Sequence, residues 1–411
     1  MANITRSLAD TAGFIPQNWA NKALQVLRNA IVVAPVIARD SDFTDPGWKG
    51  KSITVPYPGT FAASDKTPGS LATVVTPTGG NSVTLSLTQH KTVDYILEDI
   101  AFSQAQQGVT MAENYGTAAG IALAEALEAD LLTQIANFTL SSLGTIGTNL
   151  AGTVVQSAQK ALDDAKAPAS DRYLFYSTKD RNALLIDTNL AQWYAYAQQQ
   201  AIGKGMIPGV YGFEGTAYSQ LLPSATGAGS PSTIQIVTIS GGATGGTFTL
   251  TYGAQTTTNI PFGAGVTTAA SIAQALLALS SVPAGGKLYV TGSGLGPFQV
   301  WFAASWGVPT AITGSATNLT GGAPAIAITN GATAGQLGVA MHKNALMLAT
   351  RPMANVSAAG VEVAVANDPA SGISLRIQMQ YQPQYRGVYV AYDILYGMTC
   401  LRPNQGVLLM S

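Results

Sequence analysis

Cysteine and histidine are scarce in this chain of 411 residues, which has one cysteine, Cys400, and two histidines, His90 and His342. A single cysteine excludes an intramolecular disulfide framework. The sequence also contains no HExxH, CxxC, GxSxG or P-loop motif. We therefore predict no catalytic residues, no metal site and no bound cofactor.

Charged side chains are also few, at 10% of the chain, where an ordinary soluble domain has about 25%. Hydrophobic residues make up 47%, and there are 44 glycines. So few charges leave little strongly solvated surface, and we expect much of the surface to contact another molecule. The net charge of −1 gives no electrostatic reason to wrap nucleic acid.

Long apolar runs are absent as well. No stretch approaches the roughly 18 uninterrupted apolar residues that mark a membrane span, so we predict no contact with a membrane. The N-terminal residues have no basic region followed by an apolar run. We therefore expect no secretory signal peptide and a cytoplasmic location at synthesis.

The most regular feature is a stretch from Gly108 to Asn137 that has no proline and is rich in strong helix formers. Its apolar residues recur at three- and four-residue intervals, at Met111, Tyr115, Ala118, Ala119, Ala122, Ala126 and Leu127. This spacing predicts one long helix with an apolar stripe. Gly116 and Gly120 would allow a sheet or a second helix to lie close against it.

A protruding hairpin is predicted before this helix. Residues 51–57 and 82–90 alternate apolar and polar side chains as strands do, with Leu85 and Leu87 on one face. The segment 58–82 between them is rich in Pro, Gly, Ser and Thr. An isolated hairpin is marginal in water, and nothing nearby in the sequence offers a surface for it. We therefore interpret the hairpin as an interaction arm.

Charged residues in and after the hairpin form the candidate site. Carboxylates beside a histidine can bind metal or exchange protons, but this cluster has one histidine and no second constellation supports it. Salt bridges at the surface or between subunits are the better interpretation. The candidate inter-subunit contacts are Lys51, Asp65, Lys66, His90, Lys91, Asp94, Glu98 and Asp99.

The segment from 215 to 342 contains a single charged side chain, Lys287. Strand-like runs alternate there with turns rich in Gly, Thr and Ser, and one helix fits 268–280. We predict a small, mainly β domain over residues 224–333, inserted into the surrounding fold. We expect this insert to project from the outer surface and to tolerate removal better than the hairpin does.

The rest of the chain is predicted to be mixed α+β. Amphipathic helices fit 18–29 and 154–166, a further helix fits 178–186, and a short buried strand fits 172–177. After the insert, the run ISLRIQM at 373–379 places its apolar residues on one face of a strand. We expect this face to pack against the long helix.

Several segments, taken in order, resemble the major capsid (coat) proteins of tailed double-stranded-DNA bacteriophages. The resemblance is carried by GKSITVPYPG, SVTLSLTQHKTVDYILEDIAFSQ, ALAEALEADLL with Asp130, GVYGFEGTAYSQLLP, VAMHKNALMLATRP and AYDILYGMTCLRP. It covers residues 15–223 and 335–411 and leaves the insert outside.

The resemblance implies an α+β fold, the HK-ninety-seven-like capsid fold shared with encapsulins and herpesvirus capsid floors, in which a spine helix packs on an antiparallel sheet. Its parts would be an N-terminal arm (1–48), an extended β-hairpin loop (49–97), the spine helix of a peripheral domain (98–150), an axial domain in two parts (151–223 and 334–366) around the inserted domain (224–333), and the peripheral sheet strands (367–411).

The resemblance also implies partners. Copies of the chain would assemble as hexamers and pentamers, through a procapsid in the host cytoplasm, into the icosahedral capsid of a virion. The shell would enclose double-stranded DNA by non-specific proximity. Because the chain begins directly at the arm, we expect a separate scaffolding protein, beside a portal. A decoration protein would be a further partner.

Two other functions remain open at this point. One keeps the fold and makes the chain the shell of an encapsulin-like compartment around a cargo enzyme. The other is a surface or adhesive protein, suggested by the Thr- and Gly-rich insert, although the missing export signal argues against it. A hydrolase is the most distant alternative and would require a clustered histidine and acid.

Deletion of residues 58–82 should leave a folded subunit that fails to form stable shells, because the hairpin is predicted to bind neighbouring copies. Circular dichroism would check folding, and electron microscopy would check assembly. Normal particles from the deleted chain would remove the role assigned to the hairpin.

Overall fold

In the computed structural model the chain divides into two compact units. The first contains Met1–Ala30, Arg39–Ala126 and Met347–Leu401, and the second contains Ile31–Ala38, Leu127–Leu346 and Arg402–Ser411. Both mix helices with strands, so the predicted α+β class is confirmed. The structure describes residues 16–39, 52–57, 63–66, 68–69, 71, 81–100, 108–187, 207, 209–225, 227, 233–263, 269–282, 288–292, 294–302, 309–331, 333–353, 361–367 and 372–411.

The first unit is built on an antiparallel sheet whose strands come from distant parts of the chain. Strand β22 (Gly387–Cys400) pairs with β21 (Ser374–Gln382) on one side and with β4 (Gln89–Glu98) on the other. β20 (Val361–Asn367) pairs with the far edge of β21, and β19 (Leu346–Arg351) and β1 (Ala38–Arg39) complete the sheet.

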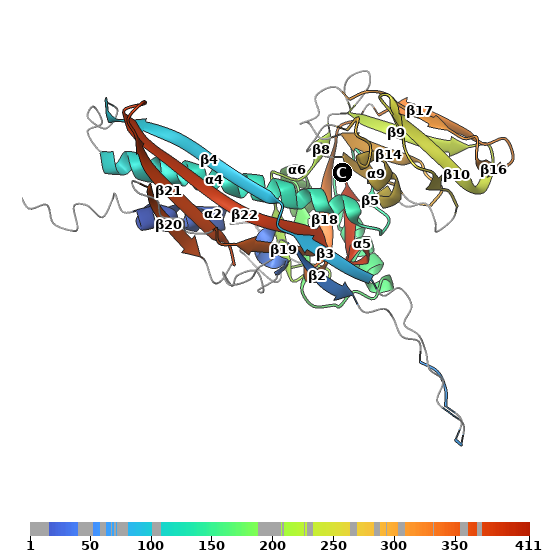
Figure 1. The fold of residues 1–411 in the computed structure, drawn as a ribbon. Coiled ribbons are helices and arrows are strands. Elements are labelled where there is room, and N and C mark those ends of the chain that lie inside the picture. The colour runs from blue at the N-terminus through green and yellow to red at the C-terminus, as the bar shows by residue number, and fades with distance from the viewer. Residues whose placement is uncertain are drawn as a thin grey trace, which may run out of the picture. The chain divides into compact units, whose positions relative to one another are not determined.

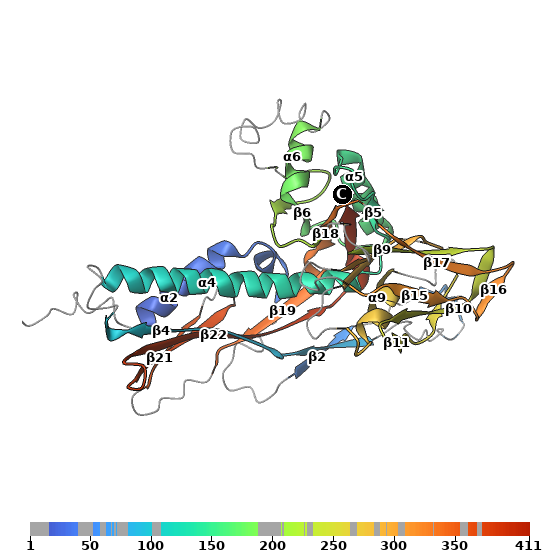
Figure 2. The same ribbon diagram turned by 90° about the horizontal axis from the view of Figure 1, so that it is seen from above.

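Two helices cover one face of this sheet, α2 (Pro16–Ala30) and α4 (Gly108–Thr133) (Figures 1 and 2). Helix α2 packs against β20 and β21, where Leu375 and Ile377 are fully buried. The apolar face predicted on this strand is therefore confirmed, but its main partner is α2. The long helix lies against α2 and reaches β4 and β22 through stacked tyrosines.

Helix α4 begins at the predicted residue, ends at Thr133, and continues as the short 3-10 helix η4 (Gln134–Asn137). The predicted stripe is partly wrong, because Ala118 and Ala122 are exposed and Tyr115 is 41% exposed. The buried line is displaced around the helix and runs through Gly116, Ala119, Gly120, Leu123, Ala124, Leu127 and Leu131. Glycines carry no apolar side chain, so the sequence pattern did not count them as core positions.

The two glycines lie where other elements approach the helix axis. A Cβ atom at Gly120 would lie 2.6 Å from the carbonyl oxygen of Ala23 in α2. A Cβ atom at Gly116 would lie 3.1 Å from the Tyr392 hydroxyl of β22. The predicted close approach is therefore present at both glycines, to a helix at one and to the sheet at the other.

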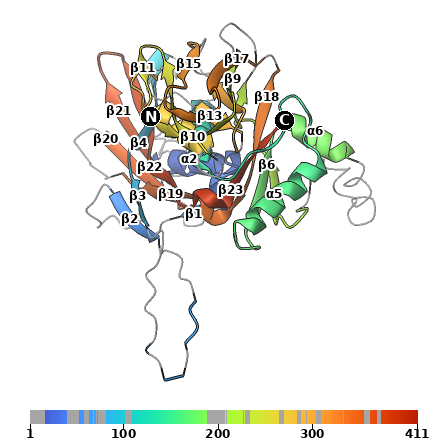
Figure 3. The ribbon, with the colours of Figure 1, turned by 90° about the vertical axis from the view of Figure 1, so that its right-hand side faces the viewer.

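The second unit contains a sheet in the order β5-β23-β18-β6-β7, with β8 also paired to β18. Helices α5 (Gly152–Asp164) and α6 (Thr178–Ile186) lie beside it, with α5 against β23 and β18 (Figure 3). These two helices and β6 are confirmed close to their predicted positions. The strands are β5 (Leu143–Gly144), β6 (Arg172–Tyr176), β7 (Gly215–Tyr218), β8 (Ser224–Ala225), β18 (Gly335–His342) and β23 (Gly406–Met410).

The strands between residues 234 and 330 pair only with one another among the described residues, whereas β8, at the start of the predicted insert, pairs with β18 outside it. They enclose their own apolar core, which includes Phe248, Ile272, Phe298 and Phe302. The elements are β9 (Ile234–Ser240), β10 (Ala243–Tyr252), β11 (Gln255–Thr256), β12 (Ile260–Pro261), α9 (Ala269–Leu277), β13 (Leu288–Thr291), β14 (Phe298–Phe302), β15 (Ile312–Ser315), β16 (Leu319–Gly321) and β17 (Ala325–Asn330).

The outer side of β13 and β14 packs against other residues of the second unit. Trp301 is 1% exposed, and a Cβ atom on Gly335 would lie 2.5 Å from its ring. The backbone N–H of Gly292 donates to Ser142 Oγ at 2.8 Å. Excision of the insert would therefore uncover apolar surface. The compact units do not follow the predicted domain boundaries, which stay predictions.

Alanine at position 120 should lower the free energy of unfolding by about 1–3 kcal/mol, because its Cβ would overlap the backbone of α2. Gly116→Ala is the matched control. It adds the same helix propensity, about 1 kcal/mol, and meets only the tip of a side chain. Denaturant unfolding of both variants would check this, and equal stabilities would contradict the close crossing of α2 and α4.

Candidate functional site

The hairpin consists of β2 (Ser52–Tyr57) and β3 (Asn81–Ser86), which pair in antiparallel register from Ser52–Ser86 to Tyr57–Asn81. The predicted pairing is thus confirmed. Its apolar face is covered at the base, where Leu85 and Leu87 pack against Met347 and Ala349 of the first unit. The surface on which the hairpin packs therefore lies more than 250 residues further along the chain, and not in the neighbouring sequence. Only the part of the hairpin beyond this base can act as an arm.

The charged residues after the hairpin lie on β4, whose side chains alternate between two faces of the sheet. His90, Thr92, Asp94, Ile96 and Glu98 share one face and are all exposed. We call this side the open face, because the helices pack on the other one. On that inner face, Lys91 is half-buried and Leu97 is buried.

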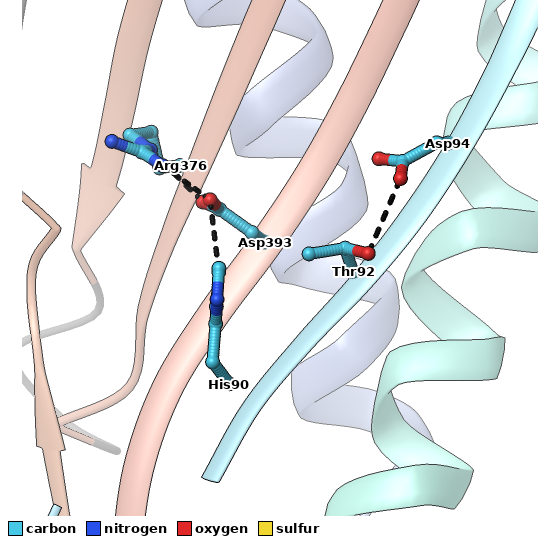
Figure 4. Close-up of polar contacts among 5 residues, drawn as sticks. All are labelled: His90, Thr92, Asp94, Arg376 and Asp393. Carbon is cyan, nitrogen blue, oxygen red and sulfur yellow. Dashed lines mark hydrogen bonds and ion pairs between the residues drawn. The ribbon is translucent and has the colours of Figure 1, made fainter. Parts of the chain in front are cut away.

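His90 belongs to a row of charged side chains that crosses three strands of the open face (Figure 4). Its Nε2 lies 3.2 Å from Oδ2 of Asp393 on β22. The Arg376 guanidinium on β21 binds the same carboxylate in a fork, with Nε donating to Oδ1 at 3.0 Å and Nη2 donating to Oδ2. Asp393 and Arg376 are 6% and 11% exposed, whereas His90 is 45% exposed. This pair is a buried ion pair within one chain.

The other carboxylates of the site have local partners. Asp94 Oδ2 accepts from the Thr92 hydroxyl at 3.2 Å (Figure 4). Asp99 Oδ2 accepts from the Tyr381 hydroxyl at 2.7 Å, which raises the pKa of this tyrosine. Glu98 is exposed at the end of β4. Asp94 and Glu98 therefore leave negative charge at the open face.

Three candidate residues belong to the hairpin itself. Asp65 and Lys66 are both exposed. Lys51 lies outside the described residues. The structure thus brings His90 and Asp94 together with β22, and it gives no contact that joins them to Asp65 or Lys66.

On the inner face, three tyrosines fasten α4 to the sheet. The Tyr95 ring of β4 stacks on Tyr115 of α4 at 5.3 Å and on Tyr392 of β22 at 6.2 Å between ring centroids. Burial raises the pKa of Tyr95 and raises that of Tyr392 to about 12, so both stay neutral at physiological pH. Stacked aromatic pairs of this kind contribute about 0.5–1.5 kcal/mol beyond their buried area.

Sequence reasoning missed Asp393 and Arg376, although each leaves a trace. Asp393 is the only charged residue in the run GVYVAYDILYG, and Arg376 is the only one in ISLRIQM. A lone charge within an apolar strand is costly unless an opposite charge pairs with it. Matching the two lone charges would have predicted the contact between β21 and β22.

The part of the chain that the structure describes offers neither a metal-binding cluster nor a membrane-spanning helix. No group of three or more His, Cys, Asp or Glu residues there could hold a metal ion. No described helix is long and apolar enough to cross a membrane.

Comparison with known proteins gives no match to a family model and none to a curated protein. Solved structures are similar at low sequence identity. The capsid structure of the cyanophage P-SCSP1u is 13% identical, with 92% of this chain and 87% of that chain covered and a TM-score of 0.49. A structure of Mycobacterium phage Che8 is 12% identical, covers 92% and 90%, and has a TM-score of 0.46.

A virus-like particle from Pyrococcus furiosus is 8% identical, with 95% of this chain and 97% of that chain covered and a TM-score of 0.40. The phage structures are of the kind that the sequence resemblance predicts. Because these TM-scores are below 0.5, the function must follow from the chain's own residues.

Replacing Asp393 by alanine should destabilise the subunit by about 3–5 kcal/mol, because it leaves the Arg376 guanidinium buried without its carboxylate. His90→Ala is the control, since an exposed partner of the same carboxylate should contribute at most about 1 kcal/mol. Thermal unfolding of the two variants would measure the difference. If the His90 variant proved the less stable of the two, the buried pair would not fix the strands.

Proposed function

We propose that this chain is the structural major capsid protein of a tailed phage, a shell protein without enzymatic activity. In this proposal it self-assembles as hexamers and pentamers into the icosahedral head that encloses double-stranded DNA. Residues 49–97 would be the extended loop, α4 the spine helix, and residues 224–333 a domain inserted into the axial domain.

The pairing of β4 with β22 carries the proposal. The segments HKTVDYILE and AYDILYGMTC are two of those on which the resemblance to capsid proteins rests, and they lie about 300 residues apart in the sequence. They form one antiparallel ladder from Gln89–Tyr396 to Glu98–Gly387. The strand between the hairpin and the long helix thus pairs with the closing strand, which supports the architecture that the resemblance implies.

Exposed apolar side chains support self-association. On α4, Tyr115 and Ile121 are 41% and 40% exposed and lie near the exposed Ala118 and Ala122. In the hairpin, Leu71 is 96% exposed. A protein with only 10% charged residues has few groups to keep such surface in water. Copies of the same chain would bury it, and weak contacts summed over many subunits make a shell stable.

The proposal also includes three partners: a scaffolding protein, a portal and the packaged DNA. A separate scaffolding protein and a portal would direct assembly in the host cytoplasm, and DNA would lie inside the finished virion without specific contacts. The near-neutral charge supports this arrangement, because a strongly basic inner surface would hold the packaged DNA tightly.

Electron microscopy of the purified full-length chain tests the proposal. We expect closed, roughly isometric shells with five- and six-fold clusters of subunits, formed either alone or with a co-expressed scaffolding protein. A compact monomer under all solution conditions would exclude the shell function. Closed shells that contain a host enzyme and no nucleic acid would instead identify an encapsulin-like compartment.

A further inference from the structure

Helix α4 carries a buried carboxylate that neither the fold nor the proposed contacts use. Glu128 is 2% exposed and lies in phase with the buried Ala124 and Leu131 of the same helix. An acidic residue at such a position is costly, since removing a carboxylate from water costs several kcal/mol even in real proteins. Glu128 and the residues that donate hydrogen bonds to it all belong to the second unit.

Both carboxylate oxygens of Glu128 accept hydrogen bonds. Oε2 accepts from the backbone N–H of Val32 at 2.6 Å and from that of Val33 at 3.3 Å. Oε1 accepts from the Ser219 hydroxyl at 3.0 Å. The carboxylate therefore holds together three segments: the residues that follow α2, the helix α4, and the residues that follow β7.

The second hydrogen bond of the Ser219 hydroxyl determines that it is the donor to Glu128. Its oxygen accepts from the backbone N–H of Leu221 at 3.2 Å, which leaves the hydroxyl proton free to point at Glu128. The site thus offers only hydrogen-bond donors, two amides and one hydroxyl. A carboxylate is an acceptor with no proton of its own, so its chemistry matches the site.

The two amides need an acceptor because of where α2 ends. In a continued helix, the N–H groups of Val32 and Val33 would bond to carbonyl groups four residues earlier. Helix α2 ends at Ala30, and the chain turns into the 3-10 helix η2 (Ala34–Val36). Val33 is fully buried, so its amide cannot turn to water instead. Glu128 supplies the missing acceptor.

Stability alone does not account for a carboxylate at this position. Burial raises the pKa of Glu128, while the bonds from Val32, Ser219 and Val33 lower it, and the net shift is upward. The folded protein therefore holds the charged form at a cost, although an apolar side chain would leave the buried Val33 amide without an acceptor. An apolar side chain also forms no directional hydrogen bonds, so it would not favour one backbone path after α2 over another.

We propose that Glu128 is a positioning residue that fixes the path of the chain after α2, and with it the N-terminal arm that takes part in self-association. The inference rests on the proposed shell function, for which the resemblance implies an N-terminal arm at residues 1–48. Glu128 would tie residues 31–33 to α4, so that every subunit presents the arm in the same direction. The partner that would bind the arm in that orientation is a second copy of this chain.

We call the hydrogen bonds from the Val32 and Val33 amides to Glu128 the clasp. Amide hydrogen exchange in the full-length protein tests it directly. In Glu128→Ala, exchange at Val32 and Val33 should accelerate about tenfold or more, the effect of losing a charge-assisted hydrogen bond. Glu128→Asp keeps the charge but withdraws it by one methylene group, so it should accelerate exchange at the same two amides. Glu128→Gln keeps one acceptor oxygen for the amides and can donate to Ser219, so its exchange should stay within about threefold of the natural chain.

Glu125→Ala is the matched control, because Glu125 is an exposed acid on the same helix, three residues earlier. It should leave both amides unchanged. If Glu128→Ala does not fold, the comparison between Glu128→Asp and Glu128→Gln still decides the result. Unchanged exchange at Val32 and Val33 in the aspartate variant would overturn the clasp.

Assembly of the same variants, followed by electron microscopy, tests the positioning role. We expect Glu128→Gln and Glu125→Ala to form shells as the natural chain does, and Glu128→Asp to form fewer closed shells or irregular ones. Regular shells from a variant whose two amides exchange quickly would overturn the positioning role. If the natural chain itself forms no shells, the proposed function fails, whereas the exchange data still report on the clasp.

Discussion

The first unit depends on the pairing of β4 with β22. β4 is 10 residues long and pairs with β22 along its whole length, although the paired residues are about 300 positions apart in the sequence. Closing so long a loop is entropically costly and slow, so the register must be strongly specified. The Tyr95–Tyr392 stack on the inner face and the His90–Asp393 contact on the open face both specify it, because a slip of one residue would exchange the two faces. Since the hairpin precedes β4 directly, this pairing also fixes the root of the hairpin.

Local periodicity predicted the helices well, because a helix satisfies its own backbone within a few residues. The bounds of α6 coincide with the prediction, and those of α2, α4 and α5 differ by a few residues. The phase of α4 was partly wrong for a physical reason. Alanine occurs on all sides of this helix, so hydrophobicity distinguishes its faces poorly, and the close approach of α2 at Gly120 selects the buried one.

Long-range pairing could not be predicted in the same way. Strand β20 was missed although NDPASG at 367–372, before its partner β21, is typical of a turn. The pairing of β4 was missed because its partner lies about 300 residues further along the chain. The candidate site shows the same limit. Sequence identified His90 and Asp94 as a charged patch, but their neighbour Asp393 is 303 residues away from His90. The sequence does contain one indication of the contact, since Asp393 and Arg376 are each the only charge in an apolar strand.

The few charges of this chain are placed unusually, and this bears on how it would associate. Arg376 and Asp393 pair in the first unit, and in the second Arg172 is 2% exposed and pairs with Asp163, while Glu128 is buried among backbone amides. Charges that most proteins leave in water are here used to fix internal geometry. These buried charges leave fewer for the surface of a chain in which only 10% of the residues are charged.

A surface of this kind associates through many weak contacts instead of a few strong ion pairs. Exposed ion pairs contribute about 0–1 kcal/mol each and depend on salt, whereas neutral contacts between copies are individually weak and change little with ionic strength. Weak contacts can open and form again, so a wrongly placed subunit can leave before its neighbours enclose it. In the proposed shell, stability would arise from the number of contacts in the closed assembly, and accuracy would arise from the rigid geometry that the buried charges maintain in each subunit.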